Sequence, residues 1–241
     1  MVELVGPATA ALQLLQAGTP GFLSRMGPKN LRARGAATVE DYVRIYRAGV
    51  LDWSEVPHAS GRALSVAVEA KAACRSAGMP GLAGMPWRLA CSARGRTVEN
   101  GYAHTVGDVV VLPLEQIEKL SRRDLISLMI HESVHVAQRM DPERARLTVA
   151  RMWGFVPASP DTLLRLRVPE VRANPDTDAE IYERAGVVCQ PVFTPDPRSL
   201  ADIRLMPHQK HAGLEWVHNP EHPFEVMAEY VADAVMGFVE P

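Results

Sequence analysis

Residues 122–140 form the segment that most limits how this chain can fold. The runs LISLMI and VHVA make this segment apolar on nearly all sides, and Ser121 precedes it with an acidic residue three positions later, which is typical of a helix N-cap. The pattern therefore predicts a buried helix over about 122–140. The same segment carries His131, Glu132 and His135. Polar groups without partners are costly to bury, so these three side chains need partners in the interior.

The spacing of these three residues suits a metal centre. On a helix, His131 and His135 project from nearly the same side, about 40° apart. Both can then bind one tetrahedral metal ion through bonds of about 2.0–2.1 Å. Glu132 lies about 100° round from His131, where it can take a proton from a water that the metal activates without being a ligand itself. The alternative is a helix whose histidines only form hydrogen bonds with the backbone.

The rest of the chain predicts an α+β fold in one domain that spans residues 1–241. Residues 1–85 are expected to form a helical N-terminal part, and residues 86–241 a catalytic core. Helices are expected at 39–49, 54–77 and 223–237, a strand at 87–91, and a β-branched strand at 105–112. A Gly and Pro cluster at 78–86 predicts a break, and ten of the 19 prolines at 157–223 predict irregular chain with short helices at most.

Composition excludes several classes of protein. The 241 residues include 26 Lys and Arg against 28 Asp and Glu, a net charge of −2, which argues against a mainly electrostatic nucleic-acid binder. No apolar run reaches the roughly 18 residues that cross a bilayer. The N-terminus lacks a basic leader, so a soluble, cytoplasmic protein is expected. Cys74, Cys91 and Cys189 are too few and too scattered for a disulfide framework.

The motif His-Glu-Ser-Val-His at 131–135 resembles the active-site helix of the zincin metallopeptidases. The resemblance implies a zinc hydrolase that acts on a peptide or protein, with His131 and His135 as zinc ligands and Glu132 as general base. It also implies a zincin-like fold, in which a small mixed sheet packs on this helix. Zincins offer an edge strand to the substrate backbone just before the helix, which here corresponds to 105–112. An ordinary core strand is the alternative for that segment.

The third ligand has to come from outside the motif. Gln138 and Asp141 stand where a metzincin has the glycine and histidine of its longer motif. The final helix is the best source, because Glu225 lies at the edge of its apolar stripe beside Ala228 and Ala232. Small residues there would let this helix approach the motif helix closely.

The arrangement also resembles the gluzincins. On that pattern Glu225 is the third zinc ligand, and Glu229 is the acid that steadies a histidine ligand. The chain departs from the pattern in having Glu rather than Asp at 229, and a longer gap between His135 and Glu225. His222 and Glu221 are lesser candidates for the ligand.

A second group of polar residues is considered for stabilising an oxyanion, a task that needs a positioned hydrogen-bond donor. His211 and Tyr182 are the first candidates, and His104 is another. His208 and His211 have metal-like spacing, but a solvated loop is the simpler interpretation. Residues 172–178 have the composition of a turn that could line a substrate cleft.

Two other functions remain open. Peptide deformylases also carry this motif and take a cysteine ligand from well upstream, where this chain has Cys91. The sequence around Cys91 does not match theirs, and a buried apolar cysteine is the common case. The other alternative is a non-catalytic zincin-like binding module, which would have no need for Glu132.

Overall fold

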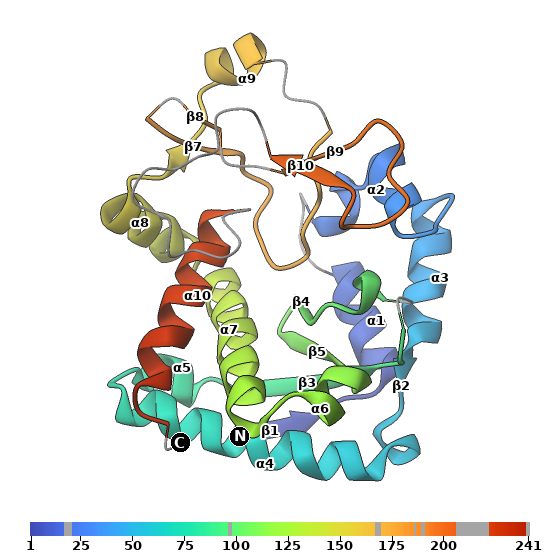
Figure 1. Cartoon of the computed structure of the whole chain (residues 1–241), viewed down its shortest axis with the longest axis vertical. Helices are drawn as coiled ribbons and strands as arrows, with labels where there is room; N and C mark the ends of the chain where they lie inside the picture. Colours follow the sequence, from blue (N-terminus) through green and yellow to red (C-terminus); the bar gives the residue numbers. More distant parts are fainter. Residues whose placement is uncertain are drawn as a thin grey trace.

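The valine-rich run before residue 114 forms the centre of a five-stranded mixed sheet (Figure 1). The computed structural model describes residues 1–16, 21–95, 98–166, 170–185, 187–188, 191–205 and 222–239. The strands of this sheet are β1 (Val2–Leu4), β2 (Val50–Leu51), β3 (Trp87–Ser92), β4 (His104–Val106) and β5 (Val109–Pro113). β3 pairs in parallel with β1 and β5 and antiparallel with β2, while β4 pairs antiparallel with β5 at the edge. The predicted strand at 87–91 is thus confirmed as β3.

The β-branched run at 105–112 is two strands rather than the single strand that was predicted. Gly107 adopts a left-handed backbone conformation, with φ of 57°, and turns the chain between β4 and β5. Val110 of β5 pairs with Leu89 of β3 on one side and with Thr105 of β4 on the other. β5 is therefore interior, and β4 is the edge strand.

Ten α-helices surround the sheets in the described part of the chain. They are α1 (Pro7–Gln16), α2 (Pro28–Ala33), α3 (Val39–Gly49), α4 (Pro57–Ser76), α5 (Pro80–Gly84), α6 (Leu114–Lys119), α7 (Arg122–Met140), α8 (Pro142–Trp153), α9 (Pro160–Leu166) and α10 (Pro223–Met236). Three short 3-10 helices accompany them: η1 (Phe22–Arg25), η2 (Trp53–Glu55) and η3 (Glu99–Gly101). Together with the mixed sheet they make an α+β fold.

The predicted helices at 39–49 and 122–140 are confirmed as α3 and α7, and the final helix ends one residue early. The helix predicted at 54–77 begins instead at Pro57, after η2, because proline suits the first turn of a helix. The predicted break at 78–86 contains the short helix α5, and α8 was not predicted. The N-terminal part is also not wholly helical, because β1 and β2 extend the sheet of the expected core.

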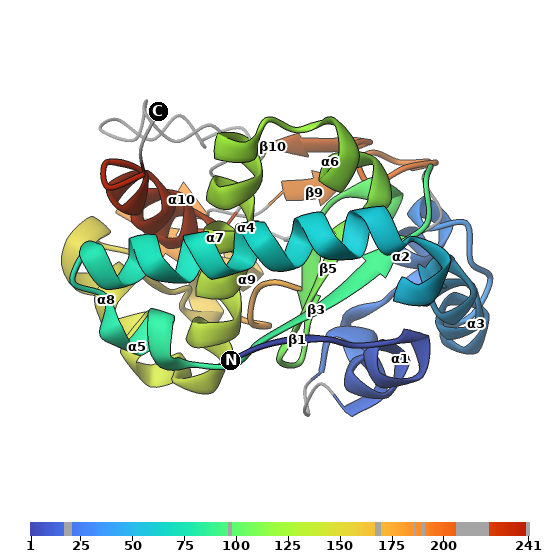
Figure 2. The same ribbon diagram turned by 90° about the horizontal axis from the view of Figure 1, so that it is seen from below.

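Both faces of the sheet are buried. Leu89 and Val110 point toward the side covered by α4, α7 and α10, while Ala90 and Val111 point toward α1 and α3. Figure 2 shows α4 lying across one face of the sheet and across α7. Because α4 belongs to the N-terminal part, that part shares one core with the motif helix.

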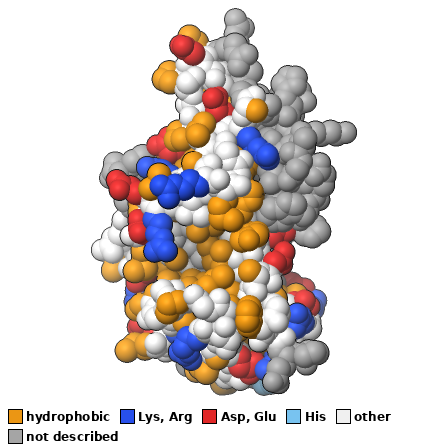
Figure 3. All heavy atoms as spheres, turned by 90° about the vertical axis from the view of Figure 1, so that its left-hand side faces the viewer, with side chains coloured by type: hydrophobic (Ala, Val, Ile, Leu, Met, Phe, Trp, Pro, Cys, Tyr) orange, Lys and Arg blue, Asp and Glu red, His pale blue; other side chains and the backbone are white. Residues whose placement is uncertain are grey.

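The described residues of the proline-rich region at 157–223 are less irregular than was predicted. Besides α9, the described residues of this region form two small sheets, one from β6 (Val156–Pro157), β7 (Tyr182–Arg184) and β8 (Val187–Val188), and one from β9 (Pro191–Phe193) and β10 (Ile203–Leu205). Figure 3 shows the side of the molecule that carries α8 and α10, where apolar side chains lie beside basic ones. None of the described helices combines the length and apolar character that a membrane crossing requires.

Candidate metal centre

The helix α7 places the motif beside α10, the helix with which it packs most extensively (Figure 1). The Ser121 side chain accepts a hydrogen bond from the Asp124 backbone N–H, so the predicted N-cap is confirmed. Buried apolar residues such as Leu125, Met129 and Ile130 hold the helix against α4 and the sheet. Regular helical spacing then brings His131 and His135 to the side that faces α10.

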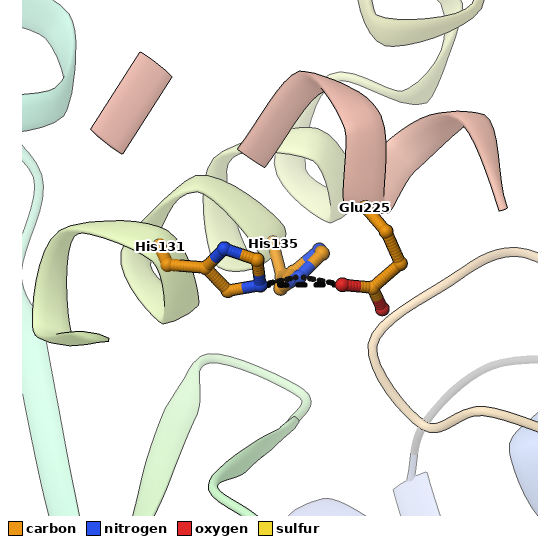
Figure 4. Close-up of side chains that lie close together, drawn as sticks. All are labelled: His131, His135 and Glu225. Atoms are coloured by element: carbon orange, nitrogen blue, oxygen red, sulfur yellow. Dashed lines mark hydrogen bonds and ion pairs between the residues drawn. The ribbon is translucent and has the colours of Figure 1, made fainter. Parts of the chain in front are cut away.

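Three ligand atoms converge at this helix pair (Figure 4). His131 Nε2 lies 3.1 Å from His135 Nε2, and these two nitrogens lie 3.2 Å and 3.3 Å from Glu225 Oε2. A tetrahedral zinc ion with bonds of about 2.0–2.1 Å needs neighbouring ligand atoms about 3.3 Å apart. The three residues therefore fit a metal ion of this kind, and in the described part of the chain they form the cluster suited to one.

Gln138, which was not predicted as a site residue, fixes the tautomer of His135. Its Nε2 donates to the Phe224 carbonyl over 2.9 Å, so its Oε1 faces His135 Nδ1, also at 2.9 Å. When His135 is neutral, its Nδ1 must then carry the proton, which leaves the Nε2 lone pair directed at the cluster. The spacing could have indicated this contact, since Gln138 lies one helical turn after His135.

Glu225 reaches the cluster from the first turn of α10. His222 caps this helix, because its Nδ1 accepts a hydrogen bond from the Phe224 N–H. One carboxylate oxygen of Glu225, Oε2, faces the histidines, and the other, Oε1, accepts a hydrogen bond of 2.6 Å from Asn174 Nδ2. The position also places a negative charge at a helix N-terminus, which is favourable.

The charges of the cluster shift one another's pKa values. Burial disfavours the charged form of Glu225, but the adjacent His135 and His131 outweigh burial and lower the pKa of Glu225 well below its ordinary value. Burial likewise disfavours the imidazolium of His135, but Glu225 outweighs it and raises the pKa of His135 to about 10. In the metal-free protein the pair thus behaves as a carboxylate beside a protonated imidazole, and a metal ion would replace that proton.

Glu132 is buried next to the cluster and is the least satisfied acid of the site. The residue is 4% exposed, and Oε2 has no hydrogen-bond partner within the described residues. Burial, followed by the negative charge of Asp176, raises the pKa of Glu132 well above its ordinary value. An orphaned carboxyl of this kind, beside three converging ligand atoms, is suited to hold and release a proton.

Two clefts meet at the cluster. One has a volume of about 390 Å³ and extends toward Arg34, Glu99 and Leu200; the other, of about 460 Å³, extends toward Gln116 and Leu128. The two clefts share Tyr102, Ala103, His131 and Glu132. Ala103 directly precedes the edge strand β4, so the junction of the clefts lies at the end of the sheet edge.

The structure does not bring Tyr182 to this cleft. Tyr182 is fully buried, packs against His222 and Phe224, and donates its hydroxyl to Asp178 Oδ2 over 2.9 Å. His211 and His208 lie outside the described residues. His104 lines the first cleft, but both ring nitrogens are engaged, with the Tyr102 carbonyl and the Tyr46 hydroxyl at 3.0 Å each.

The lesser ligand candidates lie apart from the three converging atoms. His222 caps α10, and its Nε2 lies 3.4 Å from Asp178 Oδ1. Cys91 is fully buried in the core on β3, where burial raises the pKa of its thiol to about 12. Glu229 is half-buried one turn beyond Glu225, and Glu221 lies outside the described residues. Among these candidates, the geometry favours Glu225 as the third ligand.

Comparisons of the chain with protein-family models, with curated proteins and with solved structures give no significant match.

Proposed function

We propose that this protein is a zinc-dependent metallohydrolase that cleaves peptide bonds, with a zincin-like fold of the gluzincin type. The observation that carries the proposal is the convergence of His131 Nε2, His135 Nε2 and Glu225 Oε2 within 3.1–3.3 Å of one another. The buried carboxyl of Glu132 beside them adds a group that a purely structural metal site does not need.

In this proposal His131, His135 and Glu225 hold the zinc ion, because two imidazoles and one carboxylate are a donor set that favours zinc with an open position. The ion, when bound, supplies a Lewis acid that polarises the substrate carbonyl and lowers the pKa of water. Glu132 accepts the proton of the attacking water and passes it to the leaving amine. Its Oε2 has no hydrogen-bond partner within the described residues, so it is available to take this proton and give it back.

The clefts support a polymeric substrate. Two clefts that meet at His131 and Glu132 can take the chain on both sides of a bond under attack. β4 lies antiparallel at the edge of the sheet, and Ala103 leads into it at the junction. An extended peptide could pair with the backbone at Ala103, as the zincin resemblance implies, whereas the Thr105 N–H within β4 is already bonded to Asp176 Oδ1.

The test is cleavage of a diverse peptide library by the wild type and by Glu132→Gln, with zinc content measured on the same samples. We expect Glu132→Gln to keep its zinc and to lose about 10²–10⁴-fold in turnover. Glu143→Gln, a change at an exposed position of α8, is the matched control and should leave both quantities unchanged.

The same experiment distinguishes the alternatives. A Glu132→Gln variant that cleaves peptides at the wild-type rate would contradict the proposed role of Glu132. A wild type that retains zinc and cleaves no peptide in the library would favour a binding module instead.

A further inference from the structure

Residues 171–178 form a loop that contacts the candidate ligand Glu225 from outside both helices of the metal centre. Asn174 Nδ2 donates to Glu225 Oε1 over 2.6 Å, and the two residues are 51 positions apart in the sequence. Glu225 Oε2 faces His131 and His135. The carboxylate thus has a separate partner for each oxygen.

The separate partners determine which oxygen of Glu225 faces a metal ion at the cluster. The last torsion of a glutamate side chain has a broad, nearly two-fold profile, so a carboxylate without restraint rotates easily. The hydrogen bond from Asn174 holds Oε1 away from the histidines and leaves Oε2 as the single oxygen at the cluster. Holding a ligand in its bound geometry lowers the cost of ordering it when the metal ion arrives.

Hydrogen bonds within the loop, and from the loop to β4 and α7, fix its position. Asn174 Oδ1 accepts the Asp176 backbone N–H at 2.9 Å, which closes a turn of the kind that asparagine favours. Asp176 Oδ1 then accepts both the hydroxyl and the backbone N–H of Thr105 in β4. Arg139 of α7 donates to the Pro175 carbonyl over 2.7 Å. The loop is therefore tied both to the edge strand and to the motif helix.

The N-terminal part holds the same loop from the other side. Arg25 in η1 donates to the carbonyls of Asn174, Thr177 and Asp178 over 2.6–2.9 Å. Asn30 of α2 accepts the Ala173 N–H at 2.8 Å.

Arg34 is a third residue of the N-terminal part that contacts the loop. Its guanidinium donates to the Ala173 carbonyl over 2.7 Å and forms a buried ion pair with Glu99. These contacts place Asn174 by tertiary structure rather than by local spacing.

We infer that Asn174 is a positioning residue for the metal ligand Glu225, held in place by the contacts of residues 25–34 with loop 171–178. The inference rests on the proposed function, because it assigns Asn174 a role in how Glu225 holds zinc. It also gives the N-terminal part a role in the site, since that part orients the loop that orients the ligand.

The decisive variant is Asn174→Asp, which keeps the acceptor for the Asp176 N–H and replaces the donor to Glu225 with an oxygen. Asn174→Ala is measured beside it, because it removes the donor without adding charge. Thr177→Val is the matched control, since it removes a hydroxyl from the same loop that contacts the carbonyls of Asn174 and Asp178 rather than Glu225. Zinc affinity is measured by competition with a chromophoric chelator, and ligand geometry by the visible absorption of the cobalt(II)-loaded protein.

We expect Asn174→Ala to weaken zinc binding about 10–100-fold, Asn174→Asp to weaken it at least as much, and both to change the cobalt spectrum. Thr177→Val should match the wild type in both measurements, and the unfolding temperature of each metal-free variant reports damage to the fold. An Asn174→Asp variant that binds zinc as tightly as the wild type, with the same cobalt spectrum, would overturn the inference alone. A wild type that binds no zinc would overturn the proposed function and this inference together.

Discussion

The candidate site joins two regions that are built in opposite ways, the helix α7 and the loop 171–178. In α7 the chemistry of the site comes from one helical turn, and its geometry follows from helical periodicity and apolar burial. The loop has no regular structure apart from a single bridge at Val171, and its position follows from polar contacts with η1, α2, β4 and α7. The motif is therefore local in sequence, whereas the contacts of the loop form only once the fold is complete.

The largest effect on stability is expected where the N-terminal part holds the loop. Arg34 and Glu99 are paired with their side chains 2% and 3% exposed, and Arg34→Met leaves the Glu99 carboxylate buried without its cation. We expect the free energy of unfolding to fall by about 3–5 kcal/mol, measured by chemical denaturation.

Arg32→Met is the control for this change. Arg32 pairs with Asp196 at the surface, where the side chains are 58% and 63% exposed, and exposed pairs contribute at most about 1 kcal/mol. Equal losses from Arg32→Met and Arg34→Met would contradict the role given to the buried pair.

The next prediction concerns zinc affinity and how Gln138 orients His135 on α7. Gln138→Leu removes the acceptor for His135 Nδ1 and the donor to the Phe224 carbonyl. Zinc affinity should fall about 10–100-fold, as measured by chelator competition. Gln138→Glu keeps an acceptor for His135 and should bind zinc more tightly than Gln138→Leu. If the two variants bind zinc equally well, Gln138 does not orient His135.

A smaller effect is expected from acid, because a protonated Glu99 can still form hydrogen bonds. Burial disfavours the charged form of Glu99, but Arg34 outweighs it and lowers the pKa of Glu99 below its ordinary value. The folded state then binds fewer protons than the unfolded state, so this stabilisation is complete above the unfolded-state pKa of about 4.3 and is lost as the pH falls through the lower folded-state value.

Glu99→Gln tests that dependence. Its free energy of unfolding should fall less steeply than that of the wild type between about pH 5 and pH 3, since the titrating group is gone. Parallel pH profiles for the two proteins would show that Glu99 does not contribute to the acid sensitivity.

The smallest effect is expected at the start of α7. Ser121→Ala removes the side chain that accepts the Asp124 N–H, which should cost about 1 kcal/mol in the free energy of unfolding. Zinc affinity should stay unchanged, because the cap lies more than two helical turns before His131. A loss of zinc affinity comparable with that of Asn174→Ala would contradict the claim that the loop, and not the start of α7, orients the ligands.

The local half of the site could be predicted from the sequence. His131, Glu132 and His135 follow from helical spacing. Glu225 lies 94 positions from His131 and is not local, but the small residues beside it on α10 predicted its close approach to α7. Residues 105–112 were predicted as one strand, although the chain turns at Gly107. A single glycine within a β-branched run is a weak signal for a turn.

The long-range half could not be predicted in this way. Asn174 contacts Glu225 across 51 residues, and Arg25 contacts Asn174 across 149. Tyr182 was predicted near the reaction, but it contacts Asp178 in a buried cluster with His222. Such pairs depend on how α10 and the N-terminal part pack, and no periodicity of the sequence records that packing.

The zinc content of the purified wild type, His135→Ala and Glu225→Ala tests the metal centre most directly, and it is measured by elemental analysis after equilibration with zinc. We expect about one zinc ion per chain in the wild type and a loss of zinc in both variants, because each removes one of three ligands. A Glu225→Ala variant that retains its zinc while His135→Ala does not would contradict the assignment of the third ligand. A wild type without zinc would contradict the metal centre itself.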